Sequence, residues 1–477
     1  MKNPKNRFSE WYSEITQKAD LCDLRYNVKG FVVFMPNSVI TMKEMYRIYE
    51  KELEKRGHKP IWLPALIPES NFKKEGEHVE GFTPQVFWVS HAGKNALEER
   101  LAMRPTSETA IYKMFSLWIR SENDLPFKTY HSAQVWRYET RATRPFIRSR
   151  EFHWIETHNA FANVEDALKQ VKEDMELTEE VLHKRFGIPF IFFSRPQWDK
   201  FPGADYTFAA DTLMPDGKVL QLPSTHLISE KFSKAFGIGY LDKNGERRNC
   251  RTTCYGPAIS RIYAALISIH GDDRGLVLPF ELAPVQVIIV PIIKKERSND
   301  IISFCKKVCK KLETKYRAFL DLSENTPGFK FNKWEMLGAA IRIEVGEKEV
   351  AESKVTLVRR DTGEKETVSL KELNRRISAI KRNMISRLRE RADDEFQRRI
   401  FDAKNIDELN EKIKLGGFVK VPLCTIEMEG KICADKIKEV SNGDVRGEAY
   451  GKREKVGGTC VVCGKAANSL VYVARQY

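Results

Sequence analysis

The sequence predicts an α+β fold in three parts, on the strength of three observations. Strands alternate with turns over residues 188–223, which is typical of an antiparallel sheet. A continuous β-branched run at 284–293 indicates a buried strand of an α/β unit. The length of 477 residues is enough for about three domains. We therefore expect an antiparallel sheet carrying helices in 1–283, an α/β unit in 284–400 and a small α+β unit in 401–477.

The first part is predicted to open with a helix and an interface strand. Apolar residues recur at helical spacing between Met35 and Arg56. Residues 57–68 then have strand and turn character and stop at prolines, which suits an interface element. A charged amphipathic helix is expected over 164–186, and a turn at 214–218 should separate two strands of the sheet.

In the second part, the strand at 284–293 is followed by a predicted helix over 295–315. Further strands are expected over 341–346 and 355–360. Ser369 and Glu372 have the spacing of a capping box, so a long basic helix is expected to begin there and to reach about Ile400. This helix would link the second part to the third.

The charge balance indicates a polyanionic partner. The formal net charge is +14, which favours nucleic acid ahead of a membrane; a merely soluble basic protein is the alternative. No apolar run approaches the ~18 residues of a spanning helix, and the opening segment lacks an apolar signal core. We expect a cytoplasmic protein whose nine cysteines are free thiols or metal ligands rather than disulfides.

One arginine-rich segment has the residues of a phosphate clamp. Arg137 and Glu139 share a face if they lie on a strand, and 140–148 has the character of a mobile hairpin. Arg148 and Phe152 follow, so guanidinium groups could hold a triphosphate while an aromatic ring stacks on a base. A solvated charge run is the alternative interpretation.

Four cysteines near the end of the sequence predict a metal site. Eight residues separate Cys424 from Cys433, and 26 separate Cys433 from Cys460, which forms a CxxC pair with Cys463. Four thiolates suit tetrahedral Zn²⁺ in a closed structural site. Because the first pair is spaced more widely than usual, reduced thiols are the alternative.

These segments resemble the class II aminoacyl-tRNA synthetases. Residues 57–68 are similar to motif 1, the dimer element, 134–152 to motif 2, and 252–261, with Gly256 and Arg261, to motif 3. The resemblance covers nearly the whole chain and narrows to the prolyl-tRNA synthetase family of the archaeal or eukaryote-like type. The segments that carry it are RPTSET (104–109), GADYTF (203–208), QLPSTH (221–226), HGDDRGLVLP (270–279) and TPGFKFNKWE (326–335).

This resemblance implies a homodimeric enzyme that activates L-proline with ATP and Mg²⁺ and transfers it to the 3′ end of tRNA(Pro). In-line displacement at phosphorus depends on positioning and charge neutralisation. The catalytic residues would be Arg137 between the proline carboxylate and the α-phosphate, Arg148 at the outer end of the triphosphate, and Arg261 over adenine and the γ-phosphate. One rival is a related synthetase with a catalytic zinc, such as the threonyl form. The proposed pocket residues contain no His/Cys set that could bind such a zinc, so they do not support this rival. The other rival is a non-catalytic RNA-binding or regulatory protein. Such a protein should have lost the phosphate-binding arginines, whereas all three are present here.

The resemblance also assigns the substrate contacts. Thr106 and Glu108 would take the proline ammonium, although RPTSET also fits a helix cap. The pocket for the proline ring would be walled by Trp154, His158, Phe201 and His226. Ordinary packing in the core is the alternative interpretation for each of these residues. ATP would be held by Arg137, Glu139, Arg148, Phe152, Gln221, Ser224 and Arg261.

The sequence departs from the family pattern at two places. The family usually has threonine where Ser224 stands, and one residue fewer between Gly256 and Arg261, so the alignment at Ile259 and Ser260 is open. Cys250 and Cys254, just upstream, are interpreted as pocket-lining thiols.

Residues 284–400 resemble the anticodon-binding domain of related synthetases, in which aromatic and charged groups read unpaired bases. Lys330, Glu335 and Arg342 are the candidate tRNA contacts, and Trp334 is either a contact or core. Similar enzymes have a zinc-binding domain at 401–477 and end in a tyrosine near the active site, here Tyr477.

Bacterial relatives carry an editing insertion between motifs 2 and 3. The 99 residues between Phe152 and Thr252 leave no room for it. Since a small pocket discriminates weakly between small side chains, we expect the protein to activate some cysteine or alanine and to clear neither product.

Overall fold

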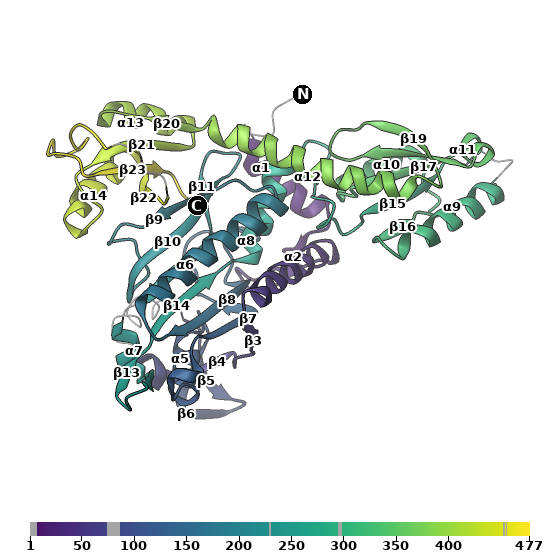
Figure 1. Cartoon of the computed structure of the whole chain (residues 1–477). Coiled ribbons are helices and arrows are strands. Elements are labelled where there is room, and N and C mark those ends of the chain that lie inside the picture. The colour runs from purple at the N-terminus through teal and green to yellow at the C-terminus, as the bar shows by residue number, and fades with distance from the viewer. Residues whose placement is uncertain (1–6, 74–85, 229, 294–297, 452–453, 455) are drawn as a thin grey trace.

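The computed structural model describes residues 7–73, 86–228, 230–293, 298–451, 454 and 456–477. Figure 1 shows a central sheet with its helices, a smaller sheet at one end and the C-terminal strands at the other, linked by the long helix α12 (Leu373–Gln397). This arrangement confirms the predicted α+β fold class in its three parts. No helix among the described residues is long and apolar enough to cross a bilayer.

An eleven-stranded sheet runs through the centre of the molecule. Its neighbouring strands are antiparallel except for the pairs β3–β7 and β20–β21. In spatial order the strands are β20 (Ile400–Asp402), β21 (Phe418–Leu423), β23 (Ser469–Ala474), β22 (Asp444–Ala449), β9 (Ile191–Ser194), β10 (Ala204–Leu213), β11 (Val219–Ile228), β14 (Arg251–Gly256), β8 (Glu151–Phe161), β7 (Phe127–Trp136) and β3 (Lys59–Pro60). The predicted turn at 214–218 joins β10 to β11.

Both helices predicted in the first part are present. The first is α2 (Pro36–Lys55). The second is α6 (Val164–Thr178), which begins at the capping side chain of Asn163 and continues as a π-helical turn (Glu179–Arg185). α6 and α8 (Ile259–His270) pack on the central strands, and α2 packs on α8 (Figure 1).

The interface strand predicted at 57–68 is instead two short strands in different sheets. β3 pairs with β7, whereas β4 (Leu66–Pro68) pairs with β6 (Asn95–Met103), which also pairs with β5 (Trp88–Ala92). Pro60 and Pro64 lack the N–H that a continuous ladder needs. Between the strands, Ile61 and Leu63 pack against a core cluster, whereas Trp62 points outward and keeps 91% of its surface accessible.

The interval between motifs 2 and 3 is filled by elements of the first part itself. The described residues between Phe152 and Thr252 form strands of the central sheet, α6, α7 (Glu230–Phe236) and the hairpin β12–β13 (Gly239–Leu241, Arg247–Asn249). The other elements of this part are α1 (Phe8–Lys18), β1 (Cys22–Asp23), β2 (Val33–Phe34), α3 (Glu69–Lys73), α5 (Glu108–Trp118) and a 3₁₀ turn (Glu122–Asp124).

The second part is a five-stranded sheet with helices, as predicted. Its spatial order is β16 (Ala318–Leu320), β15 (Val287–Pro291), β17 (Ile341–Val345), β18 (Lys354–Arg359) and β19 (Lys365–Ser369). β15 is buried throughout and pairs in parallel with both neighbours, which explains its continuous apolar run. The helices are α9 (Ser298–Glu313), α10 (Pro327–Met336) and α11 (Glu347–Glu352). Residues 295–297 of the predicted helix lie outside the described residues.

The capping box predicted at Ser369 and Glu372 is wrong. Ser369 ends β19, where it pairs with Lys354, and α12 begins only at Leu373. The Ser369 hydroxyl contacts the Glu372 carboxylate at 3.3 Å instead of capping a helix amide. Strand pairing therefore overrides the local signal, while the helix still links the second part to the third.

The third part extends the central sheet. Its strands β20–β23 carry α13 (Ile406–Lys412), α14 (Lys431–Ser441) and two 3₁₀ turns (Ile413–Leu415, Met428–Gly430). β22 pairs with β9 through Glu448 opposite Ser194 and Ala449 opposite Phe193. The C-terminal strands are thereby fixed in register to the sheet of the first part.

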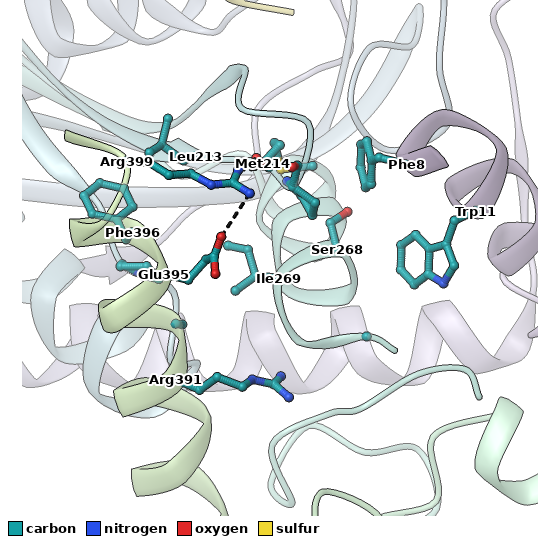
Figure 2. Close-up of a pocket in the computed structure, with 14 residues that line it drawn as sticks. Phe8, Trp11, Leu213, Met214, Ser268, Ile269, Arg391, Glu395, Phe396 and Arg399 are labelled. Atoms are coloured by element: carbon teal, nitrogen blue, oxygen red, sulfur yellow. Dashed lines mark hydrogen bonds and ion pairs between the residues drawn. The ribbon is translucent and has the colours of Figure 1, made fainter. Parts of the chain in front are cut away.

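A mostly apolar cavity of about 220 Å³ lies where α1, α8 and α12 meet (Figure 2). Phe8 and Trp11 line one side of it. Its charged groups are already paired: Arg399 lies 2.9 Å from Glu395, and Arg391 donates to a main-chain oxygen at the end of α8 at 2.9 Å. This cavity is a junction of packed elements, and the polar cavity described next is the better candidate for chemistry.

Candidate active site

A polar cavity of about 320 Å³ lies on strands β8, β10, β11 and β14. Alternate residues of β8 face it, because successive side chains of a strand point to opposite faces. Ten of the thirteen predicted proline and ATP residues line this cavity, namely Thr106, Glu108, Arg137, Phe152, Trp154, Phe201, Gln221, Ser224, His226 and Arg261.

Two more of the predicted residues line an adjoining cavity of about 70 Å³. Arg148 and Glu139 lie there with their charged groups 3.4 Å apart. Arg137, Phe152 and Arg261 line both cavities, which makes these residues the shared wall. The residues of the predicted phosphate clamp therefore line two neighbouring cavities.

The strand placement of Arg137 and Glu139 needs correction. β7 ends at Trp136, so both residues lie in the connection to β8 rather than on one strand face. The predicted hairpin is present, since β7 and β8 are antiparallel and a bridge between Arg144 and Arg148 closes the loop. Arg148 turns back toward Arg137 through this loop geometry.

The three arginines place three guanidinium groups around the two cavities. Burial, together with the charges of Arg137 and Arg148, lowers the pKa of Arg261 to about 10. Burial also lowers the pKa of Arg137, whose Nε donates to the Pro105 carbonyl at 3.0 Å. Guanidinium groups that repel one another in a buried cavity are stabilised by a bound polyanion.

At the other end of the cavity, the start of α5 meets β8. α5 begins at Glu108, so RPTSET is indeed a helix start, and this start also places the carboxylate in the cavity. The side chain of Ser107 makes no cap bond; its N–H donates to Glu156 Oε2 at 3.1 Å, and Thr106 Oγ1 donates to Glu108. An anion from β8 thus lies at the positive end of the helix.

Glu156 lines the cavity and was missed by the sequence analysis. It lies two residues after Trp154 on the same face of β8, and this spacing was the signal that could have identified it. Burial opposes its ionisation, but contacts with His158 and Ser107 lower the pKa of Glu156. The site therefore contains two buried carboxylates near each other, Glu108 and Glu156.

His158 lies behind the wall of the cavity, which corrects its predicted place on it. Its Nε2 is 3.2 Å from Glu156 Oε2, and the Tyr112 ring from α5 covers it edge-on at 6.0 Å. Burial disfavours protonation, yet Glu156 and Glu108 raise the pKa of His158 above its ordinary value. Donor atoms of Glu108, Glu156 and His158 lie within 4.8 Å of one another. The imidazole pairs with Glu156, so at most one of the two carboxylates is balanced within this cluster.

His226 is held from both sides. Its Nδ1 lies 2.9 Å from Thr207 Oγ1, its Nε2 lies 3.0 Å from Ser224 Oγ, and the Phe201 ring packs against it at 4.8 Å. Cys254 lines the cavity as predicted. The prediction for Cys250 is wrong, since that residue precedes β14 and packs in an apolar cluster.

The end of the chain also reaches the site. Arg148, Gln221 and Arg261 line a third cavity together with Gln476 and Tyr477. This agrees with the expected approach of Tyr477. Three further residues of the polar cavity, Arg195, Asp199 and Lys200, were missed because no motif marks them.

The four cysteines of the third part converge. Their sulfur atoms lie within 4.8 Å of one another, and Cys424 Sγ is 3.7 Å from Cys433 Sγ. Tetrahedral coordination with Zn–S bonds of ~2.3 Å requires sulfur atoms about 3.8 Å apart. The donor set of Cys424, Cys433, Cys460 and Cys463 therefore fits zinc.

Of the three candidate anticodon contacts, two lie together at a cavity wall. Arg342 Nη1 donates to Glu335 Oε1 at 2.8 Å, and both line a small cavity with Trp334. Two of the candidates need correction because they are buried: the Lys330 ammonium donates to the Asp321 carbonyl at 3.0 Å, and Arg342 Nε donates to Glu344 Oε1 at 3.0 Å. Trp334 is partly core, and its Nε1 donates to Asp321 at 2.7 Å.

An antiparallel sheet that carries motif arginines around a polar cavity, followed by a second sheet, defines a class II aminoacyl-tRNA synthetase. Residues 87–270 match the family model of the tRNA synthetase class II core domain (G, H, P, S and T), and residues 286–380 match an anticodon binding domain. Residues 406–477 match the C-terminal domain of prolyl-tRNA synthetase. The chain belongs to the proline–tRNA ligase family.

Known proline–tRNA ligases are similar to this chain in sequence and structure along its whole length. A proline–tRNA ligase from Thermofilum pendens is 51% identical over 98% of this chain and 97% of its own. The structure of Giardia lamblia prolyl-tRNA synthetase with prolyl-adenylate is 35% identical, covers 99% of both chains and superposes with a TM-score of 0.95. The Cryptosporidium parvum enzyme with halofuginone and AMPPNP is 30% identical, with coverage of 100% and 99% and a TM-score of 0.93. Since relatives of similar size match end to end, the chain lacks a bacterial-type editing insertion.

Proposed function

We propose that the two neighbouring cavities together hold L-proline at the Glu108 end and ATP at the arginine end. The observation that carries this proposal is the position of Arg137, which lines both cavities and lies between the two ends. A proline carboxylate beside Arg137 attacks the α-phosphorus, prolyl-adenylate forms, and pyrophosphate leaves. The nucleophile is already ionised, so the protein contributes alignment and charge neutralisation.

Each arginine takes a separate share of the negative charge. Arg137 neutralises the α-phosphate, where charge increases in the transition state, while Arg148 and Arg261 hold the outer phosphates. Phe152 stacks against adenine; in the structure its ring packs against the Arg137 guanidinium at 5.3 Å. Glu139 is a carboxylate close to this end of the site and would be available to Mg²⁺ bound with ATP, which would offset the charge of the leaving pyrophosphate.

The proline end is built for a small cationic ring. Glu108 and Thr106 accept the ammonium protons, with the negative charge of Glu156 nearby. Trp154, Phe201 and His226 enclose the ring, and the hydroxyls of Thr207 and Ser224 fix the imidazole. His158 acts indirectly, by holding Glu156 in place. A pocket of this kind excludes large side chains but rejects alanine and cysteine weakly, and uncorrected activation of both is expected.

The third part binds one structural Zn²⁺ through Cys424, Cys433, Cys460 and Cys463. The convergence of their sulfur atoms supports this. All four positions would be protein ligands, so the ion would cross-link the loops around α14 and take no part in the reaction.

The enzyme works as a cytoplasmic homodimer that binds tRNA(Pro). The exposed apolar residues near β1, α2 and β3, among them Tyr26, Ile40 and Trp62, support a subunit interface at motif 1. Glu335 and Arg342 support anticodon recognition, and the net charge of +14 suits a polyanionic partner.

Proline-dependent ATP–pyrophosphate exchange tests the assignment. The purified protein should exchange with proline, and Arg137→Ala should reduce the rate about 10²–10³-fold, as expected for loss of a charge-stabilising donor. Arg47→Ala is the matched control, since Arg47 is exposed and pairs with Glu44 away from the cavity. Exchange that depends on another amino acid and not on proline would contradict the proposal.

A further inference from the structure

We propose that Arg446, in the C-terminal part, is a positioning residue for the ATP end of the site and acts through Asp211 and Arg195 on Gln221. In the proposed function Gln221 binds ATP, whereas Arg446, Asp211 and Arg195 do not contact the substrate. The inference rests on that proposed function. It makes the C-terminal part a support of the catalytic geometry.

A buried ionic triad connects the two parts. Asp211 accepts from Arg195 Nη1 and Nη2 at 3.0 and 2.7 Å, and from Arg446 Nε at 2.8 Å. The side chains of Arg195, Asp211 and Arg446 are 1%, 0% and 3% exposed. Burial alone would raise the pKa of Asp211, but the two arginines lower it below its ordinary value, so the carboxylate stays ionised.

The triad fixes the orientation of the Gln221 amide. Arg195 Nη2 donates to Gln221 Oε1 at 3.1 Å, while Gln221 itself lines the polar cavity. A guanidinium group only donates hydrogen bonds, so the amide oxygen must be the atom that faces Arg195. The amide nitrogen is then the group of Gln221 that remains for a ligand, and it can donate to a ribose hydroxyl or a phosphate oxygen.

The triad also sets the charge of the cavity wall. Two arginines share one carboxylate, which leaves one positive charge, and Arg195 lines the cavity. Asp199 and Lys200 line it as well, with one charge of each sign, and leave that balance unchanged. Without Arg446, Asp211 would neutralise Arg195 completely. The wall would then lose the positive charge that favours a triphosphate.

The backbone around Arg446 is shaped to reach Asp211. The pairing of β22 with β23 shifts register between Val445 and Gly447. Gly447 has φ of +116°, and a Cβ there would lie 2.0 Å from the Ser194 carbonyl oxygen, so only glycine allows β22 to approach β9 this closely. The Arg446 carbonyl in turn accepts from Arg195 Nη1 at 2.9 Å.

The test is proline-dependent ATP–pyrophosphate exchange by the full-length enzyme. Arg446→Met should raise the KM for ATP about tenfold and change the KM for proline less than twofold, and Arg446→Lys, which keeps the charge, should lie between it and wild type. Lys420→Met is the control, because Lys420 belongs to the same part and pairs with Asp402 at 3.0 Å outside the triad; its KM for ATP should be unchanged.

A double-mutant cycle separates positioning from stability. Gln221→Ala should raise the KM for ATP by itself, and Arg446→Met should add little in that background because both changes affect one contact. Multiplicative effects, an unchanged KM for ATP in Arg446→Met and Arg446→Lys, or an equal rise in Lys420→Met would overturn the inference. Absence of proline-dependent exchange in the wild type would instead contradict the proposed function.

Discussion

Arg148 donates a hydrogen bond from Nη2 to the main-chain oxygen of Tyr477, a residue 329 positions later in the chain. Tyr477 is kept there by the strand β11, since its N–H donates to the Val219 carbonyl at 3.3 Å and Val219 N donates to Arg475 at 2.8 Å. β14 pairs with β11 only from Ser224 onward, which leaves this edge open for the chain end. The motif 2 arginine is therefore held from the C-terminal part.

Removal of Tyr477 should weaken ATP binding. Arg148 would lose one fixed acceptor, and loss of one hydrogen bond of ~1 kcal/mol corresponds to a KM for ATP about fivefold higher. Tyr477→Phe is the matched control: it retains the main-chain oxygen and removes a buried hydroxyl, so its KM should stay near wild type. Steady-state pyrophosphate exchange measures both, and an equal change in both variants would show that the hydroxyl matters rather than the main-chain contact.

Glu108→Gln should raise the KM for proline about 10–100-fold and leave the KM for ATP within twofold. The substitution keeps the shape of the side chain but removes the charge that balances the proline ammonium. Glu98→Gln on the exposed face of β6 is the control. A larger effect on ATP than on proline would reverse the assignment of the two ends of the cavity.

One zinc ion per chain should be found by elemental analysis. Cys463→Ser should lose it and lower the melting temperature, because the ion would cross-link Cys424 and Cys433 to the loop that carries Cys460 and Cys463. Cys309→Ser, a half-buried cysteine of α9, should keep the full zinc content. Full zinc content in Cys463→Ser would contradict the site.

Trp62→Glu should convert the dimer to a monomer. A ring that is 91% exposed in one chain is expected to be buried by a partner, and a charge there would have to be desolvated. Light scattering should give half the molecular mass, whereas Leu168→Glu on the exposed face of α6 should leave the mass unchanged. A wild-type protein that is already monomeric would disprove the motif 1 interface.

His183 should make stability depend on pH. Its Nδ1 lies 2.6 Å from Glu179 and its Nε2 lies 2.9 Å from Asp393, and the bond to Glu179 is the main reason that its pKa is raised. Because the folded pKa exceeds the unfolded value of ~6.5, the stabilisation is complete below pH ~6.5 and is lost as pH rises through the folded pKa.

The measurement for His183 is the melting temperature of wild type and His183→Gln between pH 5.5 and 8.5. The difference between the two proteins should be largest at the acidic end. His91→Gln, at an exposed position of β5, should show no such trend. A difference that grows with pH would mean that the imidazole acts in its neutral form.

The sequence by itself determined which chemical groups the protein has and much of their local frame. The arginines, the cysteine spacing, the buried strand β15 and the helices α2 and α6 follow from residue type and periodicity, which are local properties. Predictions from local sequence failed at two places. Ser369 pairs in a strand instead of capping a helix, and Arg137 lies in a connection instead of on a strand.

Only the tertiary structure decided which groups meet. His158 lies behind the cavity and Lys330 lies beneath the surface because neighbouring elements cover them. The spacing of residues along the chain does not predict which elements cover a side chain. The contacts of Arg148 with Tyr477 and of Arg446 with Asp211 join residues hundreds of positions apart through the pairing of β22 with β9 and of the chain end with β11. Such contacts depend on strand register, which is fixed when the sheet assembles.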